Sequence, residues 1–351
     1  MENELSDAVN ETLAKLDFGD LSNLSVFGGD NFITLLGQIL SGQFFTNYPD
    51  IFTGIMALLG QMVLAVLPVV VLIVAITILC GFVSAGKNDR GVGNLVYFVA
   101  YAAVVLIVVG SVTDLVKMVG NTLNVIKTQV DLVFPIILTL MAAGGATTSA
   151  GLYQPAVAIL STGIIQIFSY VVMPLFIISF AFSVVAHLAP NTRLDRFVAF
   201  FGSLFKWLVG ICLTVFLSFM TLQGVTAGSF DSISIRATKM TMAGYVPIVG
   251  NYLSQGFDLI MASSVLIKNA VGLSGILLLL GIVLSPIIKI VIFSLALKLA
   301  AAVTQPVADS RISNFLTAIG KCFAMLVSCL LVVAFMYLIS LALLIMTGNV
   351  I

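Results

Sequence analysis

The chain has 351 residues, of which 60% are hydrophobic and only 9% are charged, and its formal net charge is zero. Its mean hydropathy is +1.20, whereas a soluble domain carries about 25% charged residues. These values exclude an ordinary soluble protein and a basic nucleic-acid-binding protein, and they predict an all-α, polytopic membrane helical bundle.

The first 50 residues are acidic, with eight carboxylates and one lysine, and the rest of the chain carries an excess of bases. Within residues 3–17, apolar side chains recur on one helical face opposite the acids, which predicts an amphipathic helix. Its acidic face is a poor match for anionic lipid. We therefore expect residues 1–50 to be an extracytoplasmic segment that packs on the bundle or on a partner, followed by a transmembrane domain over residues 51–351.

Six apolar stretches exceed or approach the length of about 20 residues that a bilayer requires. Proline residues at 68, 174 and 286 predict kinks within them. The predicted spans are residues 51–86, 91–113, 155–188, 198–226, 271–304 and 315–347.

Two further stretches, residues 132–150 and 244–266, each contain a proline near the start and are predicted to be re-entrant or interfacial segments. With six spans, both termini lie outside and the basic loops all face the cytoplasm, which the positive-inside rule favours. A seventh span is the alternative, if residues 132–150 cross the membrane completely. The basic loops are those that hold Lys87 and Arg90, Arg193 and Arg196, and Arg311 and Lys321.

An internal repeat is indicated by a shift of 112 residues, which places Lys127 on Lys239, Pro135 on Pro247 and Pro174 on Pro286. The predicted units, residues 91–190 and 198–306, point the same way across the membrane and are followed by the last span. Membrane repeats often place a functional path at their interface, lined by broken helices.

Charges at membrane depth are costly and normally face a bundle interior, a cavity or the interface. Lys289 is a candidate for a pore or partner-ion role, with Asp258 as its best counter-ion candidate, and a structural role is the equal alternative. Lys298 is expected to extend to the cytoplasmic interface. The candidate pore or partner residues are Arg236, Lys239, Pro247, Gly250, Asp258, Lys268, Asn269, Pro286, Lys289, Lys298, Gln305, Pro306, Asp309 and Arg311.

The sequence has no phosphate-binding loop, metal-ligand cluster, nucleophile elbow or pair of catalytic carboxylates. We therefore predict no enzymatic activity and no cofactor. The four cysteines lie in apolar runs and are expected to pack as small apolar residues. His187 is expected to be an interfacial residue rather than a base.

Several strings carry a resemblance to a known family. They are Arg236-Ala-Thr-Lys239, Val246-Pro247-Ile-Val-Gly250, Leu266-Ile-Lys268-Asn269, Pro286-Ile-Ile-Lys289, Lys298-Leu-Ala-Ala-Ala302 and Gln305-Pro306 with Asp309 and Arg311. Over roughly residues 50–351, the chain resembles stage III sporulation protein AE of endospore-forming bacteria.

This resemblance implies a multi-pass protein of the mother-cell membrane that faces the engulfed forespore. It implies a place in a secretion-like channel complex together with other stage III sporulation membrane proteins, ring-forming intermembrane proteins, a cytoplasmic ATPase and a forespore-membrane partner. Two alternatives stay open: a stand-alone secondary transporter of a small solute, and a non-conducting scaffold. Association with further copies of the same chain is also left open, and no nucleic-acid partner is expected.

Overall fold

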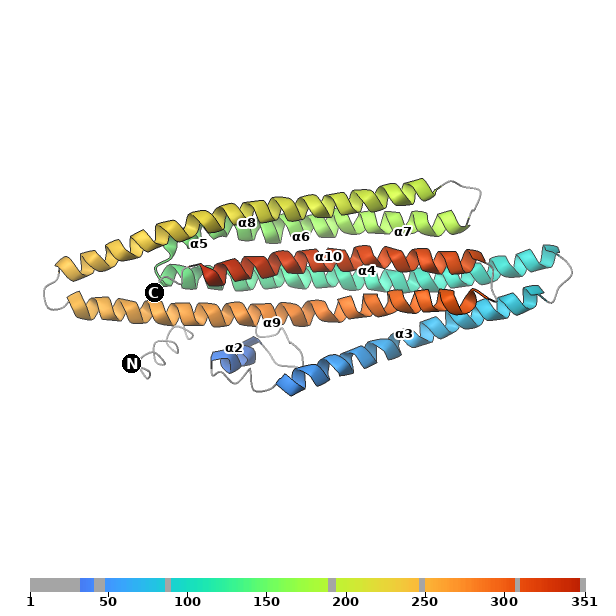
Figure 1. The fold of residues 1–351 in the computed structure, drawn as a ribbon, viewed down its shortest axis with the longest axis horizontal. Helices are drawn as coiled ribbons and strands as arrows, with labels where there is room; N and C mark the ends of the chain where they lie inside the picture. The colour runs from blue at the N-terminus through green and yellow to red at the C-terminus, as the bar shows by residue number, and fades with distance from the viewer. Residues whose placement is uncertain are drawn as a thin grey trace.

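The computed structural model describes residues 32–40, 48–85, 90–188, 194–245, 250–306 and 310–347, and every regular element in these ranges is a helix (Figure 1). The predicted amphipathic helix over residues 3–17 lies outside them. The long helices are α3 (Tyr48–Ala85), α4 (Arg90–Ala143), α8 (Asp195–Tyr245), α9 (Gly250–Thr304) and α10 (Ser310–Met346). The short helix α2 spans Phe32–Leu40.

A further long helical rod connects α4 to α8 and contains two short π-helical segments. It consists of α5 (Thr147–Ala158), η4 (Ile159–Ile164), α6 (Ile165–Ile167), η5 (Phe168–Val172) and α7 (Met173–Leu188), where η marks a π-helical segment. The second π-helical segment ends two residues before Pro174, which has no backbone N–H to donate. Wider turns of this kind let a helix continue past a proline.

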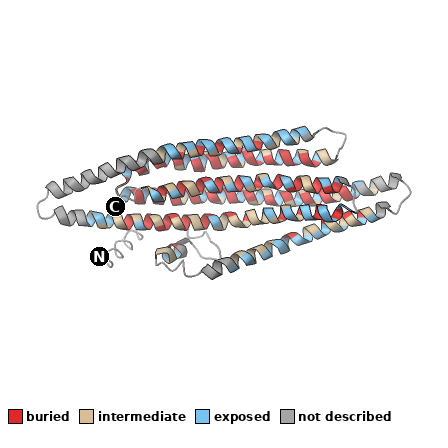
Figure 2. Ribbon diagram, in the orientation of Figure 1, coloured by how far each residue is buried: buried red, intermediate tan, exposed pale blue. Residues whose placement is uncertain are grey.

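The helices form an elongated bundle in which α4 and α10 lie at the centre, α7 and α8 on one side, and α9 and α3 on the other (Figure 1). Buried residues are concentrated on the inner helices, while α3 and α8 expose much of their surface (Figure 2). In the most apolar part of α10, 50% of the residues are buried, against 22% in α3 and in α8. Because the exposed residues of α3 and α8 are largely apolar, these two helices present the lipid-facing surface.

A regular seam of apolar side chains explains why α4 is so long. Val119, Leu123, Ile126, Val130 and Val133 are all fully buried, and their spacing alternates between four and three residues. This is the spacing with which helices pack side by side as in a coiled coil. The seam makes one continuous 54-residue helix more stable than a helix interrupted by a surface segment.

The prediction of a re-entrant segment over residues 132–150 is therefore wrong. Residues 132–143 continue α4, with Pro135 on its exposed face, and the chain reverses only in the turn after Ala143. Gly145 adopts a φ of 86° in that turn, a conformation that glycine reaches without steric cost. The helix predicted to begin at Pro155 accordingly begins at Thr147.

The second predicted re-entrant segment, residues 244–266, also differs from the structure where it is described. Helix α8 extends to Tyr245, and residues 250–266 form the beginning of α9. The glycines and polar residues of this region favoured a broken segment in the sequence, but α9 is one uninterrupted helix from Gly250 to Thr304.

The number of predicted spans is confirmed, because six of the described helices are long and apolar enough to cross a membrane. Helices α3, α7 and α9 end at one end of the bundle, where α4, α8 and α10 begin with Arg90, Arg196 and Arg311 in their first turns; we call it the basic end (Figure 1). In addition, α4 with the α5–α7 rod and α8 with α9 form two successive hairpins whose first helices run in the same direction. The duplication itself stays a prediction.

The topology can be tested with two engineered cysteines, because the four native cysteines are all buried. Gln305 is exposed at the basic end and Thr147 is exposed at the opposite end. We expect a membrane-impermeant maleimide added to intact vegetative cells that express the chain in their outer cell membrane to label the Thr147→Cys variant and to spare Gln305→Cys, since basic loops stay in the cytoplasm. Permeabilised cells should label both variants, and the reverse pattern in intact cells would contradict this orientation.

Candidate functional site

Lys268 is the one lysine, arginine, aspartate or glutamate that is buried among the side chains that the structure describes, with 1% of its surface exposed. Its ammonium Nζ donates a hydrogen bond of 2.5 Å to the main-chain oxygen of Thr347. Thr347 follows directly after α10, where the last carbonyls of a helix have no partner within it. A cation at this position also interacts favourably with the helix dipole.

Tyr153 of α5 completes this arrangement, which we name the Lys268 junction (Lys268, Thr347 and Tyr153). The Tyr153 hydroxyl lies 3.2 Å from Thr347 Oγ1, either atom being able to donate, and Tyr153 is 1% exposed. Thr347 Oγ1 in turn donates to the Leu343 carbonyl at 2.7 Å. The junction therefore connects α5, α9 and the end of α10, three elements that are distant in the sequence.

Two buried polar atoms lie on α9 close to Lys268. Asn269 Oδ1 and Ser264 Oγ are buried and form no hydrogen bond within the described part of the chain. The Cβ of Ser264 also lies 3.6 Å from the position that a Cβ on Gly144 would occupy, so the α4–α5 turn packs against this part of α9. The junction thus lies at the end of the bundle opposite the basic end, beside that turn.

Helix α9 approaches α4 and α10 closely one to two turns further along. Gln129 of α4 is fully buried, and its Nε2 donates to the Gly275 carbonyl at 2.7 Å. A Cβ on Gly275 would lie 3.3 Å from Val133 of α4 and 3.2 Å from Leu341 of α10. The absence of side chains at Gly272 and Gly275 is what permits three helices to meet here.

Lys289 does not pair with Asp258, so that prediction is wrong. Both residues lie on the continuous helix α9, and at 1.5 Å per residue they are separated by about 46 Å. Lys289 is partly buried and follows the buried Pro286, whereas Asp258 is exposed. Lys298 is exposed, and its Cγ lies 3.3 Å from the position of a Cβ on Gly320 of α10.

The structure does not bring the fourteen candidate residues together, because most of them are spread along α9 and its ends. Gln305, Pro306 and Arg311 are exposed at the basic end. Arg236, Lys239 and Gly250 lie within helices, but their side chains are outside the described set, as are Pro247 and Asp309 entirely. Of the fourteen, Lys268 has the best-defined role, and its partners Thr347 and Tyr153 were not among the candidates.

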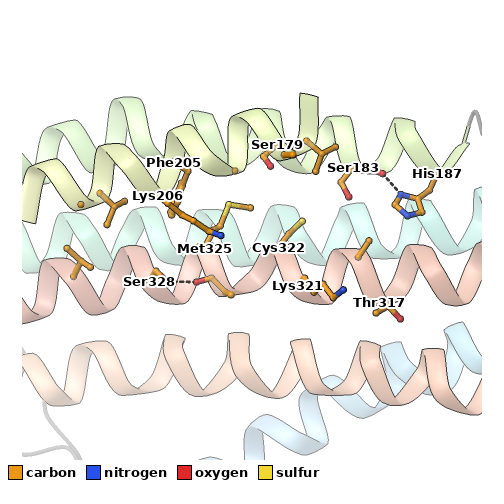
Figure 3. A pocket seen from close by; sticks show the side chains of 18 of the residues that line it. Ser179, Ser183, His187, Phe205, Lys206, Thr317, Lys321, Cys322, Met325 and Ser328 are labelled. Carbon is orange, nitrogen blue, oxygen red and sulfur yellow. Dashed lines mark hydrogen bonds between the residues drawn. The ribbon is translucent and has the colours of Figure 1, made fainter. Parts of the chain in front are cut away.

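A pocket of about 790 Å³ lies between α7, α8 and α10 (Figure 3), and the sequence did not predict it. Ser179, Ser183 and His187 line it from α7, and His187 Nδ1 lies 2.8 Å from the Ser183 carbonyl oxygen. Lys206 of α8 and Lys321 of α10 are both exposed at its rim, and the residues that line it include no carboxylate. The pocket is therefore a cationic groove with an apolar wall.

Comparison with known proteins agrees with the resemblance seen in the sequence. No solved structure matches the chain. A curated relative, "Stage III sporulation protein AE" of Bacillus subtilis (strain 168), is 24% identical over 280 residues, which cover 79% of this chain and 70% of the relative. The profile of the family described as "Stage III sporulation protein AE" matches residues 31–348, and the chain therefore belongs to that family.

Proposed function

We propose that this chain is a membrane component of a channel that joins the mother cell to the engulfed forespore during endospore formation. The observation that carries the proposal is the family match over residues 31–348, which supports a role in sporulation. The family is one of sporulation membrane proteins rather than a known enzyme family. In this proposal an ATPase and ring-forming proteins are supplied by other chains of the complex.

The lengths of the helices support a role within a larger assembly. Helices α4, α8 and α9 have 54, 51 and 55 residues, which correspond to about 80 Å each. The hydrocarbon core of a bilayer is about 30 Å thick. Each of these helices therefore extends beyond the lipid and offers a rigid surface to protein partners.

The distribution of charge supports an orientation for that assembly. Arg90, Arg196 and Arg311 lie at one end of the bundle, and the α4–α5 turn with the Lys268 junction lies at the other. By the positive-inside rule, the basic end faces the mother-cell cytoplasm, where the ATPase would act. The opposite end then faces the space between the two membranes, where the ring-forming proteins would bind.

A pull-down from sporulating cells tests this proposal. The chain would carry a C-terminal tag, and the membranes would be solubilised gently after engulfment. We expect the ring-forming proteins and the ATPase to be recovered with it in a particle much larger than one chain. An unrelated polytopic protein of the mother-cell membrane, carrying the same tag, is the control and should recover neither partner.

Recovery of the chain alone, as a monodisperse monomer or dimer, would contradict the proposal. Solute flux in proteoliposomes would then be the next measurement, because a chain that functions without partners would have to transport a small solute by itself.

A further inference from the structure

We infer that the pocket between α7, α8 and α10 is a binding site for an anionic phospholipid, with its headgroup at Lys206 and Lys321. This inference goes beyond the proposed channel role and does not depend on it. It rests on the placement of charge, polarity and apolar surface along the pocket, and on the position of the pocket within the membrane-spanning helices.

The two lysines approach the pocket from α8 and α10, at different levels along it (Figure 3). Helices α8 and α10 begin at the same end, and each lysine is eleven residues from the first residue of its helix, Asp195 or Ser310. Helix α8 begins further in along the bundle than α10 (Figure 1), so Lys206 lies deeper in the pocket than Lys321. In Figure 3, Lys206 extends from α8 toward Met325 of α10, into the gap that the pocket occupies.

The pocket becomes less polar with depth. His187, Asn314 and Thr317 line it on the side of the basic end, and Val209 and Val332 line it on the side of the membrane centre. Ser328 and Lys206 are the polar exceptions at depth (Figure 3), and Ser328 Oγ already donates to the Ala324 carbonyl of its own helix at 2.7 Å. This gradient matches an amphiphile whose head lies toward the cytoplasm and whose acyl chain points into the bilayer.

A buried serine hydroxyl borders the same pocket. Ser179 is fully buried, lines the pocket, and its Oγ has no hydrogen-bond partner among the described residues. A buried hydroxyl without a partner costs free energy. Because Ser179 Oγ has no exposed surface, a lipid oxygen can reach it only when a neighbouring side chain moves aside.

The surroundings favour lipid over a soluble anion or an acidic peptide. The lining residues on α7, α8 and α10 all fall within candidate membrane spans. On α8, Phe200 and Trp207 are exposed by 60% and 66% and therefore face lipid. Basic pockets between membrane helices on the cytoplasmic side bind anionic lipid headgroups, and a free anion would leave the apolar half of this pocket empty.

The test uses Trp207, the single tryptophan of the chain, which adjoins Lys206 on the exposed side of α8. The purified full-length protein would be reconstituted into phosphatidylcholine vesicles that contain either dibrominated phosphatidylglycerol or dibrominated phosphatidylcholine. Bromine quenches tryptophan fluorescence at short range. We expect stronger quenching by the anionic lipid, with a preference that decreases about fivefold for each lysine removed, in Lys206→Gln and Lys321→Gln.

Two further variants make the result specific. Lys117→Gln removes an exposed lysine of α4 that does not line the pocket, and it should keep the full preference. Ala324→Leu fills the groove without changing its charge and should abolish the preference. Equal quenching by the two lipids in the unmodified protein, or an undiminished preference in the double lysine variant, would overturn the inference. Loss of the preference on addition of inorganic phosphate would instead assign the site to a free anion and would also overturn it.

Discussion

The Gly272→Ala variant is expected to unfold at a markedly lower temperature than the unmodified protein, although alanine is normally the better helix former. A Cβ on Gly272 would lie 2.5 Å from Cγ1 and 2.6 Å from Cδ1 of Ile345 on α10. Overpacking of a close interface costs about 1–3 kcal/mol. Because both contacts are shorter than 3.0 Å and one is to Cγ1 rather than to the end of the side chain, we expect a cost in the upper part of this range, above the helical propensity of about 1 kcal/mol that alanine gains over glycine.

Thermal unfolding in detergent can be followed with a thiol-reactive fluorescent dye, since all four cysteines are buried in the folded protein. Gly120→Ala in α4 is the matched control, because a Cβ there meets nothing within 4 Å, and it should raise the unfolding temperature or leave it unchanged. Ile345→Ala combined with Gly272→Ala should recover part of the loss. If Gly272→Ala is as stable as Gly120→Ala, the close contact between α9 and α10 is not as described.

The sequence was sufficient to predict the helical class, the six spans and the basic end of the bundle, because these properties depend on local composition. It was not sufficient to predict that α4 continues unbroken. Asp114, Lys117 and Asp131 interrupt the apolar run when it is read along the chain, but all three are exposed. The buried seam from Val119 to Val133 passes between them, and only the path of the helix in three dimensions separates the two faces.

The candidate site could be predicted only in part, for a related reason. Lys268 was recognised as a charge at membrane depth, but its acceptor is 79 residues away in the sequence, and the Tyr153 hydroxyl joins from a further helix. Lys289 and Asp258 were grouped because both are charged and belong to the same stretch, yet a continuous helix holds them far apart. Charged residues that belong to one stretch of the sequence are therefore not close in space when that stretch is a single straight helix such as α9.

The sequence did not predict the pocket, because neither of its two lysines is unusual when it is considered by itself. Lys206 and Lys321 each resemble an interfacial lysine near the start of a span, and they lie more than a hundred residues apart. They line one pocket because α8 and α10 run in the same direction along its walls. The relative placement of two helices that are distant in the sequence is a property of the tertiary structure, and local sequence patterns do not predict it.

The Lys268→Met variant is expected to open the C-terminal turn of α10 without unfolding the bundle. Methionine fills a similar volume but cannot donate to the Thr347 carbonyl, which accepts a hydrogen bond from Lys268 Nζ. A hydrogen bond to a charged group contributes about 1.5–3 kcal/mol. Amide hydrogen exchange in residues 343–347 should therefore accelerate about 10- to 150-fold, as measured by mass spectrometry on the purified protein.

Three comparison variants separate the ammonium from the rest of the junction. Lys289→Met removes a partly buried lysine of the same helix and should leave exchange at the end of α10 unchanged. Tyr153→Phe and Thr347→Val each remove the contact between the two hydroxyls but keep the main-chain acceptor of Lys268, and Thr347→Val also removes the hydrogen bond from Thr347 Oγ1 to the Leu343 carbonyl. Because a neutral hydrogen bond contributes only about 0.5–1.5 kcal/mol, Tyr153→Phe should have a smaller effect than Lys268→Met, and Thr347→Val should have a larger effect than Tyr153→Phe. If Lys268→Met accelerates exchange no more than Lys289→Met does, the hydrogen bond from the buried ammonium does not stabilise the C-terminal turn of α10. The contacts of the junction would then result from the packing of the helices and would not stabilise it.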